Sequence, residues 1–272
     1  MQNKVIKKVL MCQPLHFASL NYSINPWMHP GTINSTQAMK QWNDLVTLYK
    51  AIGIEVSIID QQADVPDMVF ATDQGIVEGH TVLLSRFWHQ ERRGESKYYK
   101  QWFKKQGYSV QSLPDNIYFE GNGDALFWKN KLFIGVGYRA DTATCRTISR
   151  LIKADIVPLM INHPAFYHLD VAFFPLNNET AFYYPEAFSY ESRQVLRKEV
   201  PNLIAFTKEE ADGFCANSIV TDHHVIHQKG NPTFVKKLKQ LGYTSVEVDL
   251  GEFKKSGGGA HCLTNILETA IN

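Results

Sequence analysis

The chain has 272 residues, with 28 basic and 27 acidic side chains and a formal net charge of +1. This near-neutral balance argues against a nucleic-acid partner or a membrane-surface partner, and no apolar run is long enough to cross a bilayer. Hydrophobic residues make up 44% of the chain, which indicates a globular protein with a sizeable core. The start shows no clear cleavage signal, so we expect a cytoplasmic location.

Strands and helices alternate along the first half of the chain. Apolar spacing and turn residues predict a strand at 7–14, a helix at 36–53, a strand at 54–60, a strand at 74–85, a helix at 92–107, and a hairpin at 124–137 with Lys129 and Asn130 near its turn.

The same rhythm returns in the second half. The pattern predicts helices at 142–154 and 189–200, two short strands within 218–228, a helix at 233–242, a strand at 244–250, and a last helix that starts near Cys262. No linker or low-complexity segment divides the chain, so we expect one domain over residues 1–272, of α/β or α+β class.

Cys262 follows three consecutive glycines in "SGGGAHCLTNIL". Glycines let the backbone approach a ligand closely, so this segment could aim a nucleophilic thiol at a substrate. A helix N-terminus at Cys262 would lower the pKa of the thiol. The alternative is a small buried residue at a helix start. The other cysteines, Cys12, Cys145 and Cys215, are scattered and form no CxxC pair, which argues against a disulfide framework.

A cysteine nucleophile needs a histidine within reach, and His168 in "FYHLDVAFFPL" is the best candidate. In a strand, His168 and Asp170 would point to the same face. A second group of polar residues in apolar surroundings lies in "FEGNGDALFW", where Glu120 and Asp124 flank a glycine-rich segment. A core histidine and an ordinary turn are the structural alternatives.

Two further groups of charged residues could bind an amino-acid substrate. Asp67 and Asp73 lie in "PDMVFATDQGIV", and the chain carries several arginines able to hold a carboxylate in fork geometry. The arginines considered are Arg86, Arg92, Arg93 and Arg139. Any one of them on its own is expected to be a solvated surface charge.

Together these segments resemble the guanidino-group-modifying enzymes of the pentein superfamily, which include arginine deiminases, dimethylarginine dimethylaminohydrolases, arginine dihydrolases and amidinotransferases. The shared motifs, in chain order, are "INPWM", "PDMVF", "FEGNGDAL", "FYHLDVAFFPL" and "GGGAHCLT". The resemblance extends from about Val9 to Leu267. It implies an α/β fold of five ββαβ units arranged as a five-fold pseudosymmetric propeller.

The resemblance also implies residue roles. Cys262 would be the nucleophile, His168 the acid and then the base, and Asp124 and Asp170 the carboxylates that hold the guanidinium. The remaining positions matched to substrate binding are Asn25, Asp67, Phe70 and Asp73, then Arg139 with either Arg92 or Arg93 for the substrate carboxylate, and, behind them, Glu120. The expected reaction converts arginine or a close relative to a ureido product such as citrulline, without a cofactor or a metal. The oligomeric state stays open, with a homodimer among the options.

Departures from the family patterns bear on the substrate. Arginine dihydrolases carry asparagine at the position of Asp73, which puts a second hydrolysis in doubt. Dimethylarginine enzymes have an aspartate there, but typically a glutamate at the position of Thr72 and no aspartate at that of Asp170. A second carboxylate at Asp170 suits free N–H groups, so we expect an unmethylated guanidino substrate.

Other activities are weighed against this reading. Dimethylarginine hydrolysis is the main alternative, followed by amidino transfer, arginine dihydrolysis and ligand binding without catalysis. A metal hydrolase would use Asp222, His223, His224 and His227 of "DHHVIHQ", but the expected strands break the helical spacing that would bring these side chains together.

Overall fold

Five three-stranded sheets form a ring in the computed structural model, which describes residues 4–271. In each sheet the middle strand pairs antiparallel with one neighbour and parallel with the other. Each sheet is given below as its antiparallel neighbour strand, its middle strand and its parallel neighbour strand. The first three sheets are β15 (Asn265–Ile271), β1 (Lys4–Cys12) and β2 (Glu55–Ile59); β3 (Gly75–Glu78), β4 (Thr81–Leu84) and β5 (Ser109–Gln111); and β6 (Ala125–Trp128), β7 (Lys131–Val136) and β8 (Asp155–Met160). The other two are β9 (Phe173–Pro175), β10 (Thr180–Tyr183) and β11 (Asn202–Ala205); and β12 (Ile219–Thr221), β13 (His224–Gln228) and β14 (Thr244–Val248).

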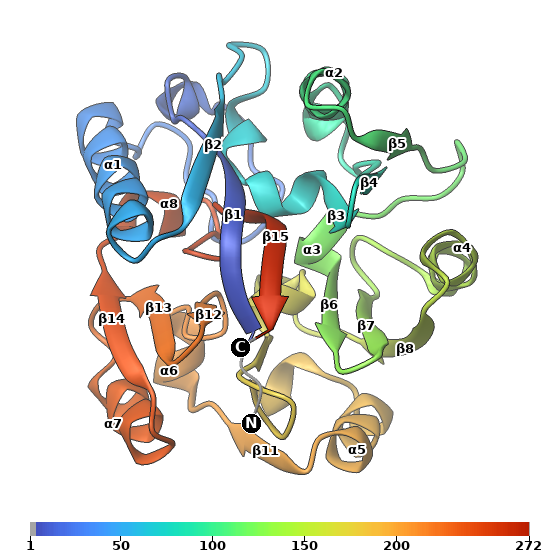
Figure 1. The fold of residues 1–272 in the computed structure, drawn as a ribbon, viewed down its shortest axis with the longest axis vertical. Helices are drawn as coiled ribbons and strands as arrows, with labels where there is room; N and C mark the ends of the chain where they lie inside the picture. Colours follow the sequence, from blue (N-terminus) through green and yellow to red (C-terminus); the bar gives the residue numbers. More distant parts are fainter. Residues whose placement is uncertain (1–3, 272) are drawn as a thin grey trace.

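A helix connects the two parallel strands of every sheet, and Figure 1 shows these five helices at the rim of the ring. They are α1 (Ser35–Ala51), α2 (Glu95–Lys105), α4 (Thr142–Ile152), α5 (Tyr190–Glu199) and α7 (Pro232–Gln240). Three shorter helices are α3 (Gly121–Asp124), α6 (Lys208–Asp212) and α8 (Gly251–Lys254). The predicted ββαβ repeat is confirmed. Within residues 4–271 no helix is both long and apolar enough to span a membrane.

The end of the chain closes the ring. Strand β15 pairs antiparallel with β1, and both lie near the centre of Figure 1. The prediction of a last helix starting near Cys262 is therefore wrong: Cys262 lies in the turn before β15. The pairing partner of this segment is at the other end of the sequence, which a local apolar pattern does not reveal.

Two other local predictions need correction. Residues 74–85 do not form one strand, because a turn at Gly79 and His80 folds them into the β3–β4 hairpin. His168 and Asp170 do not lie on a strand either: Leu169–Val171 is a 3-10 helix, with His168 at its N-terminal cap. The predicted hairpin at 124–137 is confirmed as β6–β7, with Lys129 in the left-handed conformation at its turn.

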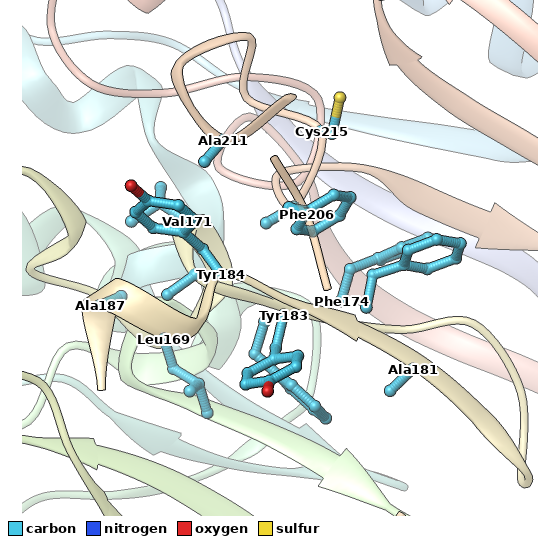
Figure 2. Packing of buried hydrophobic residues seen from close by; sticks show 14 of the residues in the cluster. Leu169, Val171, Phe174, Ala181, Tyr183, Tyr184, Ala187, Phe206, Ala211 and Cys215 are labelled. Carbon is cyan, nitrogen blue, oxygen red and sulfur yellow. The ribbon is translucent and has the colours of Figure 1, made fainter. Parts of the chain in front are cut away.

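Aromatic side chains fill the largest cluster of the core, which extends along the sheet of β9, β10 and β11. Phe182 lies at its centre, with ring centroids 5.2 Å from Phe206 and 5.3 Å from Phe234. Figure 2 shows Phe174 and Phe206 in this cluster, together with Leu169, which comes from the turn that carries Asp170. This packing fixes the position of that turn.

One polar residue lies just before the antiparallel neighbour strand of each sheet. These residues are Asp73 before β3, Asp124 before β6, Asp170 before β9, Asn217 before β12 and Cys262 before β15. All five are buried. The pseudosymmetry of the ring thus brings together five side chains that are far apart in sequence.

Candidate active site

The glycines before Cys262 allow a close approach of backbone to side chains. A Cβ atom on Gly258 would lie 2.3 Å from Cε1 of Phe70, and one on Gly259 would lie 3.0 Å from Oδ1 of Asn217. Gly257 has φ of +87°, a conformation that side chains rarely adopt. The glycine run is therefore required by the packing around Cys262.

Asn217 holds the Cys262 segment in place. Its Oδ1 accepts hydrogen bonds from the backbone N–H of Gly259 at 2.8 Å and of Cys262 at 3.0 Å. Its Nδ2 donates to Oδ2 of Asp170 at 2.8 Å and lies 3.0 Å from the Cys262 sulfur. One buried amide thus fixes both the backbone and the thiol of Cys262 and ties them to Asp170.

The Cys262 thiol lies next to a negative charge. Its sulfur is 3.2 Å from Oδ2 of Asp170, to which it donates a hydrogen bond. Burial raises the pKa of the thiol well above its ordinary value, and the charges of Asp170 and Asp73 raise it further. The expected activation of Cys262 by a helix N-terminus is absent from this site. The ligand-free thiol is therefore protonated at neutral pH.

His168 is buried among three carboxylates. Its Nε2 lies 2.8 Å from Oε2 of Glu120 and 3.9 Å from Oδ1 of Asp124, and its Nδ1 is 3.7 Å from Oδ1 of Asp73. Burial alone would lower its pKa, but the charge of Asp73, the bond to Glu120 and the charge of Asp124 raise it to about 9. The imidazole of His168 is therefore protonated on both ring nitrogens, and positively charged, at neutral pH.

The carboxylates around His168 respond differently to burial. Burial raises the pKa of Asp124 to about 7, against the opposing charge of His168. For Glu120, burial is outweighed by Arg139 and by the bond from His168, so its pKa lies well below the ordinary value. Glu120 is thus the ionised partner of the histidine, while the raised pKa of Asp124 lies near neutral pH.

Arg92 and Arg139 supply the positive charges of the site. Arg92 donates from NH1 to Asp73 at 2.7 Å and binds both oxygens of buried Glu95. Arg139 donates from NH2 to the carbonyl of Ile24 at 3.0 Å, and its guanidinium lies 4.7 Å from the ring centroid of Tyr167. Both arginines are buried, so each is held by fixed partners rather than by solvent.

Asp67 and Asn25 lie at the same end of the site as these arginines. Asp67 accepts a hydrogen bond from Tyr22 at 2.9 Å, and burial raises its pKa to about 6 despite the nearby Arg92. Asn25 donates to the hydroxyl of Tyr167 and to the carbonyl of Ser256, each at 3.2 Å. Asn25 therefore connects the segment before α1 with the glycine run.

Arg93 lies apart from this set. Its guanidinium donates to the carbonyls of Phe87 and Trp88 and lies 5.3 Å from the ring centroid of Tyr118. Arg86 pairs with exposed Asp115. Of the two alternatives that the sequence left open, Arg92 rather than Arg93 is in contact with the buried carboxylates.

Several polar atoms of the site are buried without a hydrogen-bond partner in the protein. They are Oδ1 of Asp67, Asp73, Asp124 and Asp170, and NH1 of Arg139. An unsatisfied buried polar group costs about 1–3 kcal/mol, and more when it is charged. Four acceptors and one cationic donor match a ligand with many N–H groups, a positive charge and a carboxylate.

Sequence reasoning missed three residues of this site: Asn217, His261 and Glu95. His261 binds Oδ2 of Asp170 through Nδ1 at 2.9 Å. Glu95 lies on α2, and its only sequence signal is its place three residues after Arg92. Asn217 in "CANSIV" has no local signal, because its partners come from other sheets.

The candidate metal ligands of residues 222–227 do not converge. Asp222 and His223 form the turn between β12 and β13. Both ring nitrogens of His227 have protein partners, the carbonyl of Gln228 and the hydroxyl of Ser245. Throughout residues 4–271 there is no group of three or more histidine, cysteine or carboxylate side chains arranged to hold a metal ion.

Known proteins resemble this chain in fold and in sequence over almost its whole length. The arginine dihydrolase/ornithine cyclodeaminase ArgZ of Synechocystis is 37% identical over 263 residues, which cover 94% of this chain and 37% of ArgZ. The N(G),N(G)-dimethylarginine dimethylaminohydrolase of Mycobacterium tuberculosis is 31% identical, with 95% of this chain and 85% of that protein covered. The chain thus spans little more than a third of the bifunctional relative.

A solved structure corresponds to that matched part. The N-terminal domain of ArgZ, a cysteine-to-serine mutant bound to its substrate, has a TM-score of 0.92 at 35% identity and covers 96% of this chain and 98% of that one. A further structure of this domain is covalently bound to a reaction intermediate. The eukaryotic N,N dimethylarginine dimethylhydrolase family matches residues 15–268. The chain is therefore a member of the dimethylarginine dimethylhydrolase family, within the guanidino-modifying pentein enzymes.

Proposed function

We propose that this chain is a cysteine-dependent hydrolase that converts the guanidino group of arginine, or of a close relative, to a ureido group. The observation that carries this proposal is a pair of buried carboxylate oxygens without a hydrogen-bond partner, one on Asp124 and one on Asp170, beside Cys262 and His168. A guanidinium offers planar N–H donors and a positive charge, which two buried carboxylates bind strongly.

The ends of an arginine molecule match the two ends of the site. Asp124 and Asp170 hold the guanidinium, while Arg139, whose NH1 has no hydrogen-bond partner and lies 3.8 Å from Oε1 of Glu120, holds the α-carboxylate. Asp67 and Asp73 each keep one oxygen without a hydrogen-bond partner for the α-amino group. The guanidinium, the α-ammonium group and the α-carboxylate of arginine thus each meet groups of opposite charge inside the protein.

The bound cation activates the nucleophile. A guanidinium beside Asp170 offsets the negative charge that raises the thiol pKa, so the thiolate of Cys262 forms more readily in the complex. The thiolate attacks the central guanidino carbon, and the electrons of its C=N bond move onto nitrogen. The product of this step is a tetrahedral adduct with a new C–S bond.

His168 then serves both halves of the reaction. Because Nε2 is bound to Glu120, Nδ1 gives its proton to the departing nitrogen, and the C–N bond breaks to release ammonia. In the second half, neutral Nδ1 takes a proton from water while the water oxygen attacks the same carbon. The C–S bond breaks, Cys262 leaves as thiolate, the remaining hydroxyl proton passes to water, and the carbon becomes that of a ureido group.

Asymmetric dimethylarginine is the second candidate substrate, because the matching family is named for that activity. Arginine is favoured by Asp170, whose oxygens would face methyl groups in place of N–H donors. We further propose that the reaction stops at the ureido product, because Asp73 stands where arginine dihydrolases carry asparagine. A cytoplasmic location and a homodimer stay predictions.

A product assay tests these proposals. The wild-type chain is incubated with arginine, agmatine and methylated arginines, with and without a metal chelator, and ureido product and ammonia are measured. We expect the highest kcat/KM with arginine, one ammonia per ureido product, and no effect of the chelator. Two ammonia per arginine would contradict the ureido end point. No ureido product from any of these compounds would contradict the function itself.

A further inference from the structure

A cavity of about 1140 Å³ reaches the site from the axis of the ring. Its lining comes from all five sheets, including Ile6, Ile76, Leu126, Phe173 and Ile219. Asp170 and His261 also line it, whereas His168, Arg92 and Arg139 do not. The cavity therefore meets the site on the side of Asp170, away from the residues proposed to hold the amino-acid end of the substrate.

A short chain of hydrogen bonds connects Cys262 to this cavity. The Cys262 sulfur lies 3.2 Å from Oδ2 of Asp170, and the same oxygen lies 2.9 Å from Nδ1 of His261. The side chain of Asp170 is fully buried, while that of His261 is 12% exposed. Within residues 4–271 no hydrogen bond occupies Nε2 of His261, so this nitrogen can exchange protons with water in the cavity.

The thiol needs such a connection, because the nearby histidine cannot accept its proton. Both ring nitrogens of His168 already carry a proton at neutral pH, since the pKa of this histidine is raised to about 9. Cys262 itself is protonated before a ligand binds. The thiol must therefore transfer its proton to a group other than His168 before the thiolate can attack.

We propose that His261 relays the proton of the Cys262 thiol, through Asp170, to water in the axial cavity. In this relay the S–H bond breaks and Oδ2 of Asp170 receives the proton. Oδ2 passes this proton to Nδ1 of His261, which can accept it because the imidazole starts as the Nε2–H tautomer, and Nε2 releases its own proton to water. Each electron pair stays on the atom that loses its proton, and the imidazole ends as its other tautomer. The inference rests on the proposed function, because it assumes that Cys262 is the nucleophile.

Variants of His261 test the relay in the full chain with arginine as substrate. His261→Ala should lower kcat by roughly tenfold or more while leaving KM nearly unchanged, because a proton-transfer group typically contributes 10²–10⁴-fold. Added imidazole should enter the axial cavity and restore kcat in a concentration-dependent way. His80→Ala is the matched control: His80 lines the same cavity but has no contact with Asp170, so this variant should keep the wild-type kcat and show no response to imidazole.

His261→Gln separates a relay from a structural role. The amide of glutamine can still form a hydrogen bond with Asp170 but cannot pass a proton onward, so His261→Gln should fold normally and remain as slow as the alanine variant. Wild-type kcat in either variant, restoration by glutamine, or failure of imidazole to restore His261→Ala would overturn the relay. If the wild type itself forms no ureido product, the proposed function fails together with the relay.

Discussion

Leu169, Asp170 and Val171 form one short turn that belongs to two very different regions. Leu169 and Val171 pack into the aromatic core along β9–β11, where neighbouring apolar side chains surround them. Asp170 is equally buried, but one of its oxygens has no partner. The core is built of apolar contacts, whereas the site holds buried charged groups with oxygen and nitrogen atoms that have no hydrogen-bond partner in the protein. Packing on both sides of Asp170 keeps this costly arrangement in place.

The comparison predicts that changes in the site alter catalysis and changes in the core alter stability. The largest effect is expected for Cys262→Ser. An alcohol is much harder to ionise than a thiol, so kcat should fall by roughly 10³-fold or more. The melting temperature should stay close to that of the wild type, because the substitution keeps size and surroundings. Steady-state kinetics and thermal unfolding measure both quantities, and near-normal turnover would exclude Cys262 as the nucleophile.

Phe182→Ala makes the opposite change, in the core. Phe182 is fully buried between Phe206 and Phe234, so its removal should lower the free energy of unfolding by about 3–5 kcal/mol. The kcat of the molecules that remain folded should change little. Chemical denaturation and active-site titration test this. Tyr190→Ala, at an exposed aromatic, is the control and should change stability by about 0.5 kcal/mol or less. A selective loss of kcat in Phe182→Ala would show that core and site are not separable.

Asp170→Asn tests the charge of the site through substrate choice. Methyl groups facing a buried carboxylate leave it unsatisfied, at a cost of about 1–3 kcal/mol, which corresponds to roughly tenfold or more in rate. The wild type should therefore prefer arginine over asymmetric dimethylarginine in kcat/KM, and Asp170→Asn should narrow this ratio while slowing both reactions. A wild type that prefers the dimethylated compound would favour the dimethylarginine hydrolase assignment.

The smallest expected effect is a pH dependence of stability. Burial raises the pKa of Asp67 from 3.8 to about 6 and of Asp124 from 3.8 to about 7, and carboxylates raise that of His168 from 6.5 to about 9 despite its burial. A group with a raised folded pKa stabilises the fold below its unfolded pKa, and that contribution is lost as pH rises through the folded value. The ligand-free protein should therefore lose stability between about pH 4 and pH 9.

Bound arginine should reduce this loss of stability with rising pH, because its guanidinium and amino group favour the ionised forms of the carboxylates. Thermal unfolding of Cys262→Ser with and without arginine avoids turnover and measures the difference. Phe182→Ala should keep the same pH profile at lower melting temperatures, because it leaves the charges unchanged. A ligand-free protein whose stability rises over this pH range would contradict the idea that the site stores unsatisfied charge.

Local patterns predicted the elements whose cause is local. The five crossover helices follow from apolar spacing. Helices α1 and α2 end two residues before Gly53 and Gly107, the last residues of the two predicted helices. The strand β15 was mistaken for a helix, because its strand character depends on pairing with β1 rather than on its own residues. Short strands such as β9 and β11 carry too few residues to show a period.

The residues of the site likewise divide into those with a local sequence signal and those without one. Cys262, His168 and the two aspartates proposed to bind the guanidinium could be proposed from motifs, because these motifs are continuous in sequence. Asn217 could not, because its role arises only when the turns before β9, β12 and β15 come together at the axis. The partner of His168 was likewise visible only in three dimensions, since Glu120 lies 48 residues away.

The most direct test of the account is to trap the covalent intermediate. The wild type is mixed with arginine, quenched in acid within one turnover and digested, and the peptide containing Cys262 is analysed by mass spectrometry. The account predicts a mass increase equal to arginine less one ammonia on Cys262 and on no other cysteine. An enzyme that consumes arginine with no such adduct, or with the adduct on Cys12, Cys145 or Cys215, would contradict it.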